Sequence, residues 1–328
     1  MADAAMMAAH PDAYIGCNFD VTFKDQCTLQ TCCLAQSSFL YRPNFGANLF
    51  FAIFFGAMAI PQIGLGIYYK TYGFMIAMLF GLALEVVGYV ARVLLYNNPF
   101  NGNAFLIYLI CATIAPVFIT AAIYLTITRI IVLYGAQNSY FKPRTVAIAF
   151  MFSDFTSLVL QGAGGGIADT ADTKPDQQVG VNVMIAGLIL QVVSLFAFAV
   201  FCAYFAWRSR TGVLDMAREK IAVRERWFFK AFLGSLFLAT LVIFVRSVFR
   251  VAELWQGFDG TLWNKENDFL VLDGAMMGIA VVALAAFHPG PAFLGQWAAA
   301  NWSFRAKKTP VNMETRSKET RRDYSSDA

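Results

Sequence analysis

The sequence has few charged residues for its length. Asp, Glu, Lys and Arg make up 14% of the 328 residues, whereas hydrophobic residues make up 58%. A soluble protein of this size would carry nearly twice that charged fraction. The composition therefore indicates a membrane protein, in which long apolar runs cross the bilayer.

Several motifs are absent, and each absence excludes a class of protein. The two histidines, His10 and His288, lie far apart, so no cluster exists for an intramembrane zinc hydrolase. No P-loop is present for direct use of ATP. Residues 268–288 contain no lysine for a retinal Schiff base. The Asp-Arg-Tyr triplet after span three and the Asn-Pro-x-x-Tyr motif in span seven, which ordinary G-protein coupling would require, are also missing. We therefore expect no enzyme activity, no metal and no cofactor.

What the sequence does contain is seven apolar runs of about the length of a membrane span. They predict an all-α polytopic membrane protein with one seven-helix domain, residues 47–290. No cleavable signal peptide precedes them, because the first 40 residues lack a basic start followed by an apolar core. The predicted spans are 47–69, 73–95, 104–134, 145–166, 180–206, 229–254 and 268–288.

Basic residues are distributed unequally between the two ends of these spans. Of the 25 Lys and Arg residues, three lie within spans, four lie on the N-terminal side, and 18 lie on or at the border of the opposite side. Positive charge marks the cytoplasmic face. The pattern predicts an N-terminus outside, a C-terminus inside and a basic cytoplasmic tail over 291–328, which we expect to be disordered.

Four cysteines fall in the predicted extracellular segment 1–46. Outside the cell, Cys17, Cys27, Cys32 and Cys33 suggest two disulfides. Adjacent cysteines seldom pair with each other, so we expect Cys17 and Cys27 each to join one of Cys32 and Cys33. A tail with free thiols is the alternative.

The sixth span carries charges into its apolar run. Arg246, Arg250 and Glu253 fall within one narrow stripe of a helix at about 100° per residue. Ionisable groups at this depth are costly in lipid and rarely face it. They are expected to point into the bundle, toward partners on other spans.

Other spans supply candidate partners. Span two has Glu85 and Arg92 on one face, span four has Asp154 and Gln161 on one face, and span seven has Asp273. Arg92 is close enough to the boundary to snorkel instead. Structural salt bridges would explain any single residue, but seven ionisable groups on four helices favour one outward-facing cavity that binds the polar head of an amphiphile. The predicted ligand-binding residues are Glu85, Arg92, Asp154, Gln161, Arg246, Arg250, Glu253 and Asp273.

Two further stretches have more than one interpretation. The glycines of 162–166 favour close helix packing through Gly162 and Gly166, or else expose backbone to a cavity. The basic loop 208–227 is either an amphipathic helix on anionic lipid or a solvated loop.

Several motifs resemble those of a known family. YRPNFGANLFFAIFF, LEVVGYVAR, APVFITAAIYLTITRII, SDFTSLVLQGAGGG, RSVFRVAELWQGFDGTLWNKE, VLDGAMM and HPG occur in order over nearly all seven spans. Together they resemble the fungal lipid-translocating exporter family, the RTA-like seven-span proteins.

The resemblance implies a function in lipid handling. Members of that family are implicated in resistance to toxic lipids, release of sphingoid bases and porphyrin handling. It implies a plasma-membrane transporter of lipids or amphiphiles, with membrane lipids or an amphiphilic small molecule as partners and no nucleic acid. The alternative is a receptor-like sensor that regulates lipid asymmetry without carrying substrate.

Overall fold

The structure is a computed structural model. It describes residues 13, 15, 27–29, 31–37, 39–134, 143–171, 173–211, 226–255, 257, 260, 262–293 and 297. The predictions for Cys17, for most of the basic loop 208–227 and for the tail after residue 297 fall outside these residues.

Seven helices of the described chain are long and apolar enough to cross a membrane, which confirms the predicted polytopic all-α fold. The seventh span is built from three consecutive helical segments, α9, η5 and α10. The helices are α2 (Phe45–Tyr68), α3 (Tyr72–Asn97), α4 (Gly102–Tyr134), α5 (Pro143–Thr170), α6 (Lys174–Thr211), α8 (Trp227–Leu254), α9 (Glu266–Phe269), η5 (Leu270–Ala275) and α10 (Met276–Ala286), with short η3 (Leu34–Gln36) before them and α11 (Pro289–Ala292) after them.

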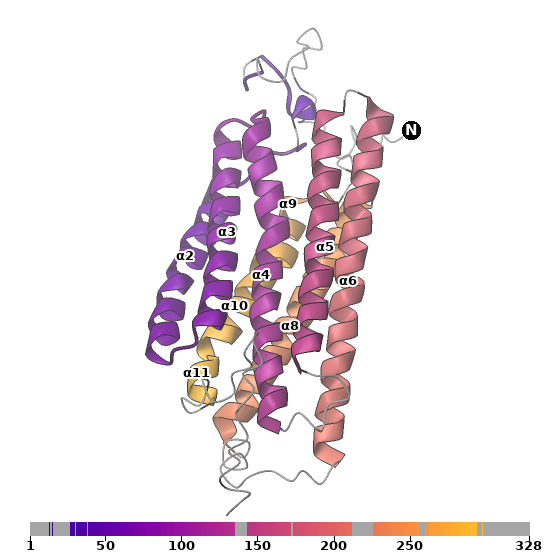
Figure 1. Ribbon diagram of the computed structural model, residues 1–328. Coiled ribbons are helices and arrows are strands. Elements are labelled where there is room, and N and C mark those ends of the chain that lie inside the picture. The colour runs from indigo at the N-terminus through magenta and orange to yellow at the C-terminus, as the bar shows by residue number, and fades with distance from the viewer. Residues whose placement is uncertain are drawn as a thin grey trace, which may run out of the picture.

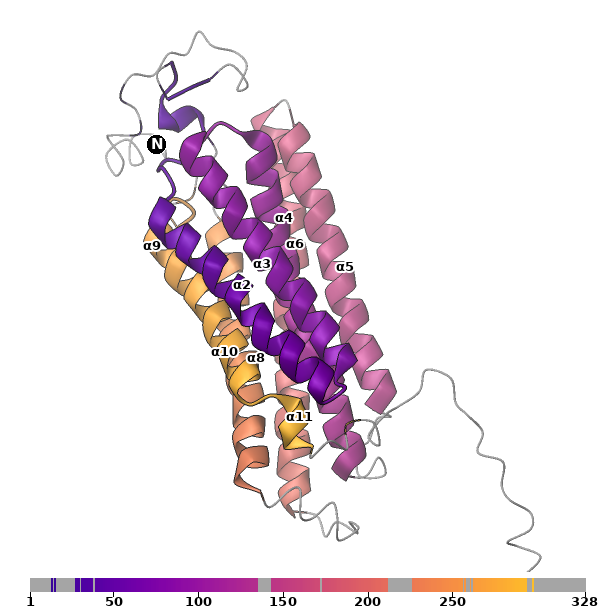
Figure 2. The same cartoon turned by 90° about the vertical axis from the view of Figure 1, so that its left-hand side faces the viewer.

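The spans form a closed bundle. Each span contacts the next one in sequence, and α10 contacts both α8 and α2, so that the ring closes. α4 also contacts α8 across the bundle. Figures 1 and 2 show the helices running alongside one another, with the segment before α2 at one end, here called the N-terminal end, and α11 toward the other.

Apolar side chains cover both the interior and the outside of the bundle. Phe55, Phe74 and Ile243 are fully buried in the core, whereas Phe50 and Phe237 are more than half exposed. Lipid tails are as apolar as the core, so exposed Phe and Leu side chains are stable on this surface. The distinguishing residues of such a fold are therefore the polar ones that it buries.

The α5–α6 contact depends on small residues, as the glycine-rich stretch predicts, but through a different glycine. A Cβ atom on Gly164 would lie 2.6 Å from the carbonyl oxygen of Gly180, whereas Gly162 and Gly166 have no neighbour within 4 Å of such an atom. The expected contact through Gly162 and Gly166 is therefore wrong. Gly164 faces α6, and Gly162 and Gly166 each lie about 160° around the helix from it. These two glycines therefore face away from α6.

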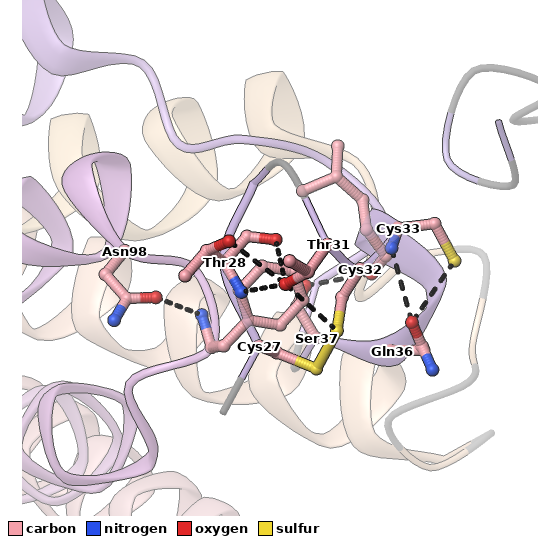
Figure 3. Close-up of a disulfide and its surroundings, with 10 residues drawn as sticks. Cys27, Thr28, Thr31, Cys32, Cys33, Gln36, Ser37 and Asn98 are labelled. Atoms are coloured by element: carbon pink, nitrogen blue, oxygen red, sulfur yellow. Dashed lines mark hydrogen bonds between the residues drawn. A yellow bond between two sulfur atoms is a disulfide. The ribbon is translucent and has the colours of Figure 1, made fainter. Parts of the chain in front are cut away.

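The N-terminal segment contains a disulfide that packs against the bundle. Cys27 and Cys32 are joined, as Figure 3 shows, and both pack with Phe100 of the turn between α3 and α4. Cys33 is also disulfide-bonded. The pairing of Cys27 with Cys32 is one of those expected, whereas the pairing of Cys17 stays a prediction.

Candidate functional site

An ion pair between α8 and the seventh span lies at the centre of the site. Arg246 Nη2 is 2.7 Å from Asp273 Oδ1 and donates a hydrogen bond of 2.6 Å to the carbonyl oxygen of Ala112 in α4. Both charged side chains are buried. Asp273 belongs to η5, a π-helical turn; such turns interrupt α-helices at functional sites in many proteins.

A second ion pair lies one turn away on α8. Arg250 Nη1 donates to Glu253 Oε2 at 2.7 Å, and both residues are buried. The Arg250 guanidinium is also 6.0 Å from the centre of the Trp263 ring. The stripe predicted from sequence therefore faces the bundle interior, as expected of ionisable groups at this depth.

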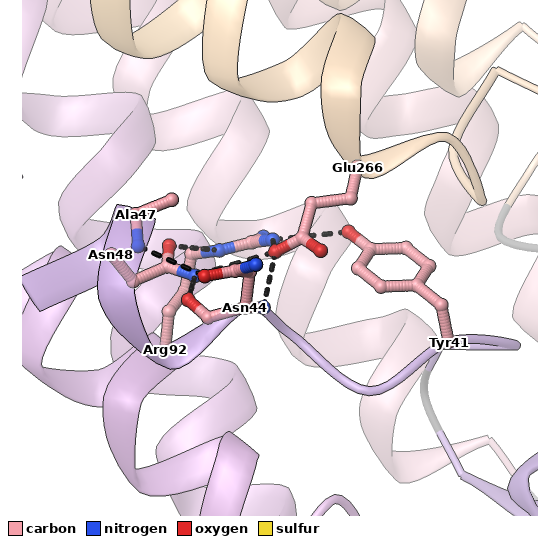
Figure 4. A network of polar contacts seen from close by, with 6 residues as sticks. All are labelled: Tyr41, Asn44, Ala47, Asn48, Arg92 and Glu266. Atoms are coloured by element: carbon pink, nitrogen blue, oxygen red, sulfur yellow. Dashed lines mark hydrogen bonds and ion pairs between the residues drawn. The ribbon is translucent and has the colours of Figure 1, made fainter.

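Arg92 of α3 connects three segments, as Figure 4 shows. Its Nε donates to Asn48 Oδ1 at 2.9 Å, and its Nη2 donates to the Tyr41 hydroxyl at 3.0 Å and lies 3.7 Å from Glu266 Oε1. The side chain is only 1% exposed. Arg92 therefore does not snorkel; its planar guanidinium meets partners from the N-terminal segment, α2 and α9 at once.

A small cavity lies between these groups. The volume that the centre of a water molecule can occupy in it is about 10 Å³, which is room for about one water. Two carboxylates and one guanidinium face it together with aromatic and small residues. It is lined by Glu85, Gly88, Tyr89, Arg92, Tyr108, Ala112, Phe269 and Asp273.

The polar groups around the cavity are incompletely satisfied. Among the described residues, buried atoms without a hydrogen-bond partner include Glu85 Oε1, Tyr89 OH, Arg92 Nη1, Arg246 Nε and Asp273 Oδ2. Buried polar atoms usually have partners, so a group of unsatisfied ones in one place calls for an explanation, such as a bound water, ion or ligand group. We name Glu85, Arg92, Arg246, Arg250, Glu253, Glu266 and Asp273 the charged network.

The charged network holds three guanidinium groups and four carboxylates. Glu85 interacts electrostatically with Asp273, Arg246 and Arg250, which links α3 to α8 and η5. If all seven groups are ionised, the network carries one net negative charge. In that state it can accept an additional cation without any change of protonation.

Aromatic rings cover the network on the side of the N-terminal end. Phe39 stacks on Trp263 with ring centres 5.6 Å apart and contacts Phe105 and Tyr108, which in turn meets Phe269. The Arg92 guanidinium lies 4.0 Å from the centre of the Phe269 ring and 4.8 Å from that of Tyr108. Such cation–π contacts stabilise the guanidinium in a site with little water.

The residues 39–44, here called the covering segment, hold this layer in place. The Leu40 amide donates to Asn264 Oδ1 at 2.9 Å, and the Asn44 amide donates to Glu266 Oε1 at 2.6 Å. Burial raises the pKa of Tyr41, so its hydroxyl stays neutral beside Arg92. The covering segment therefore closes the charged network at this end of the bundle.

Two of the eight predicted residues lie elsewhere. Asp154 accepts hydrogen bonds from Tyr124 and Thr120, whereas Gln161 donates to Ser157 and Gln191. On α4, Thr120 and Tyr124 are about 12 and 18 Å along the helix from Ala112, which lines the cavity. The structure thus brings six predicted residues together and gives Asp154 and Gln161 a separate polar environment between α4, α5 and α6.

Sequence reasoning also missed several members of the site. Glu266 was overlooked because it lies before the seventh apolar run, and Tyr41 because it precedes the first. Tyr89 follows Glu85 by four residues, so helical spacing could have placed it on the same face. Asn48 and Tyr108 carry no charge to single them out within apolar runs. Among the described residues, no group of His, Cys, Asp and Glu is arranged to hold a metal ion.

Comparisons with known proteins identify a family and several relatives. Residues 78–296 match the family model described as RTA1 like protein. The sphingoid long-chain base transporter RSB1 of Saccharomyces cerevisiae is 35% identical over 80% of this chain and 76% of its own length. Protein RTM1 of the same yeast is 29% identical over 68% of this chain and 72% of its own length. Protoporphyrin uptake protein 1 is 27% identical over 62% of this chain and 65% of its own length. No solved structure matches. The chain therefore belongs to the RTA1-like family of multi-pass membrane proteins.

Proposed function

We propose that this chain is a membrane transporter of lipids or amphiphiles. Support comes from membership of the RTA1-like family and from relatives named as a sphingoid long-chain base transporter and a protoporphyrin uptake protein. These relatives are named as transporters and not as enzymes. We place the protein in the plasma membrane with the N-terminal end outside, as the distribution of basic residues favours.

The charged network is our proposed site for the polar head of the substrate. One observation carries this proposal: the cavity is lined by Glu85 and Asp273, and each has a buried carboxylate oxygen without a partner in the described chain. A protonated amine carries the donors and the charge that such oxygens require. We therefore favour a cationic amphiphile, such as a sphingoid base, whose amine lies between Glu85 and Asp273.

The apolar surroundings suggest a place for the tail. Tyr89 of the cavity stacks on Phe51 and Phe55 of α2, with ring centres 5.1 and 5.7 Å apart. Gly274 faces Phe51, because a Cβ atom there would lie 2.9 Å from the edge of its ring. We propose that the alkyl tail lies between α2 and the seventh span, beside these rings.

The present conformation represents a closed state in this proposal. A cavity with room for about one water cannot hold an amino-alcohol head. The covering segment would have to move away from Arg92 and Glu266 before a head group entered. Loops and segments that close over a site commonly move on microsecond to millisecond timescales.

Binding and transport of a sphingoid base test the proposal. We would reconstitute wild type and Glu85→Gln, which keeps the size of the side chain but removes its charge, and measure bound base by mass spectrometry and its movement across proteoliposomes. Losing one charged partner of the amine should weaken binding about tenfold or more. Asp176→Asn is the matched control, because Asp176 is an exposed carboxylate at the same end of the bundle.

The variants also distinguish the competing possibilities. Unchanged binding of the base in Glu85→Gln would contradict the amine site. Binding of a porphyrin that Glu85→Gln leaves unchanged and Arg246→Gln abolishes would show that the site takes an anionic head. Tight binding with no movement of any base across the bilayer would overturn the transporter assignment and support a receptor-like sensor.

A further inference from the structure

A buried carboxylate lies deep in the bundle, away from the charged network. Asp154 of α5 is 2% exposed. It lies nine residues from one end of its span, Thr145–Ala168, and 14 residues from the other. These separations correspond to about 14 and 21 Å along the helix axis, so Asp154 is near the middle of the membrane.

The contacts of Asp154 come from hydroxyl groups. The Tyr124 hydroxyl donates to Oδ2 at 2.9 Å, and Thr120 Oγ1 donates to the same oxygen at 3.3 Å. Oδ1 has no hydrogen-bond partner within the described chain. No Lys, Arg or His side chain of the described residues forms a salt bridge with this carboxylate.

The other groups around Asp154 are also neutral. Ser194 of α6 lies beside its carboxylate, and Cys202 of α6 interacts with Tyr124. Tyr124 and Cys202 are thus the titratable groups that α4 and α6 bring to this place in the described chain. Neither supplies a positive charge to balance an ionised carboxylate.

Polar residues continue from Asp154 along the contact of α5 and α6. Ser157 Oγ donates to the carbonyl oxygen of Gly187 at 2.6 Å, and Gln161 Nε2 donates to Ser157 Oγ at 2.7 Å and to Gln191 Oε1 at 3.1 Å. The side chains of Asp154, Ser157, Gln161 and Gln191 are all at least nine-tenths buried. The row extends from the middle of the membrane toward the N-terminal end and offers donors and acceptors in succession.

An unpaired carboxylate in this position is expensive in its ionised form. Moving a lone charge out of water into an apolar interior costs several kcal/mol even after relaxation. Binding a proton removes the charge, whereas the hydrogen bond from the Tyr124 hydroxyl to Oδ2 favours the ionised form. The arrangement therefore balances two protonation states, and intramembrane carboxylates of this kind serve proton transfer in other transporters.

We propose that Asp154 is a reversible proton-binding site through which transport is coupled to a proton gradient. Oδ1 takes one proton from water on one side of the membrane, which neutralises the carboxylate, and later releases the same proton to the other side. The coupling rests on the transporter function proposed above. The binding of the proton does not, because it can be measured without any lipid substrate.

Infrared spectroscopy of the full chain in nanodiscs tests proton binding directly. The C=O stretching band of a protonated carboxylic acid should appear as the pH is lowered in wild type, disappear in Asp154→Asn and return at a shifted position in Asp154→Glu. A band that does not change with pH, or that Asp154→Asn leaves intact, would overturn the proposal. Dependence on sodium concentration at constant pH would overturn it as well, since the site would then bind a metal cation.

A second variant keeps the test decisive if Asp154→Asn does not fold. Tyr124→Phe leaves the carboxylate in place and removes its shorter hydrogen bond. A hydrogen bond to a charged group is strong enough to shift the pH midpoint of the band by about one unit. An unchanged midpoint in this variant would show that the titrating group is not Asp154.

Proteoliposomes separate this inference from the proposed function. With one proton per molecule transported, a gradient of one pH unit can support an accumulation of sphingoid base of about tenfold. Wild type should accumulate it and Asp154→Asn should not. If wild type moves the base but ignores the gradient, the coupling is wrong. If wild type moves no base while the infrared band still titrates, the transporter function fails and the proton site stands.

Discussion

Arg246 and Asp273 form a buried ion pair between α8 and the π-helical turn of the seventh span, with Arg246 Nη2 2.7 Å from Asp273 Oδ1. The same guanidinium nitrogen donates to the carbonyl oxygen of Ala112. Elements α4, α8 and η5 therefore meet at one side chain. The strength of this pair can be separated from its functional importance by mutation.

A double-mutant cycle should show strong coupling between Arg246 and Asp273. Arg246→Met alone leaves a buried, uncompensated carboxylate and should lower the free energy of unfolding by about 3–5 kcal/mol. Adding Asp273→Leu should restore part of this loss, although the hydrogen bond to Ala112 remains lost. Thermal unfolding in nanodiscs measures each variant. Additive losses would show that the two side chains do not act as a pair.

Arg92→Lys should loosen the covering segment. An ammonium group cannot reach Asn48, Tyr41 and Glu266 in the way that the planar guanidinium does, and we expect a loss of about 1–3 kcal/mol. Hydrogen exchange of residues 39–44 should become faster. Arg226→Lys is the control, because Arg226 is exposed at the start of α8, at the opposite end of the bundle, and its replacement should leave the exchange of residues 39–44 unchanged. Equal exchange in both variants would contradict the role given to Arg92.

Peptide mapping without reduction should recover Cys27 linked to Cys32. By the pairing expected from sequence, Cys17 should then be linked to Cys33. Replacing both Cys27 and Cys32 by serine should destabilise the N-terminal segment by about 2 kcal/mol, the value for a short closed loop. Alkylation of all four thiols in protein from the cell surface would refute the disulfides.

Tags at the two termini should show opposite accessibility in intact cells. The basic residues concentrate on the side opposite the N-terminal end, so an N-terminal tag should bind antibody without permeabilisation. A C-terminal tag should require permeabilisation. The reverse result would turn the charged network toward the cytoplasm and reverse the direction from which a substrate reaches it.

His288 should make the fold sensitive to acid. Its Nδ1 accepts a hydrogen bond from the Gly290 amide at 3.1 Å, and burial lowers its pKa from 6.5 to about 4. The unfolded chain therefore binds this proton more readily than the folded protein does. Stability is fully present above pH 6.5 and is lost as the pH falls toward 4, by at most about 3 kcal/mol.

The variant His288→Asn isolates this contribution. Asparagine can also accept the hydrogen bond at the start of α11 but does not titrate. Unfolding measured between pH 7 and pH 4 should have a smaller slope in the variant than in wild type. Identical slopes would show that His288 does not carry the acid sensitivity.

The sequence by itself determined the number and order of the spans. Long apolar runs with few charges have no stable alternative to membrane helices, because every backbone polar group in lipid must be paired within its own helix. It also determined that Arg246, Arg250 and Glu253 face the interior, since helical periodicity places them on one stripe and lipid excludes them. These conclusions follow from the spacing of residues along each helix and from the properties of the surrounding lipid.

Only the tertiary structure decided which polar residues meet. Glu85, Arg92, Arg246 and Asp273 come together because α3 and α8 both approach the seventh span at the same depth, which spacing along a single helix cannot reveal. Asp154 resembles them in sequence, yet α5 faces α4 and α6, so its partners are Tyr124 and Thr120. Glu266 joins the network from outside its apolar run for the same reason: the partner of a buried charge is chosen by helix packing and depth, not by distance along the chain.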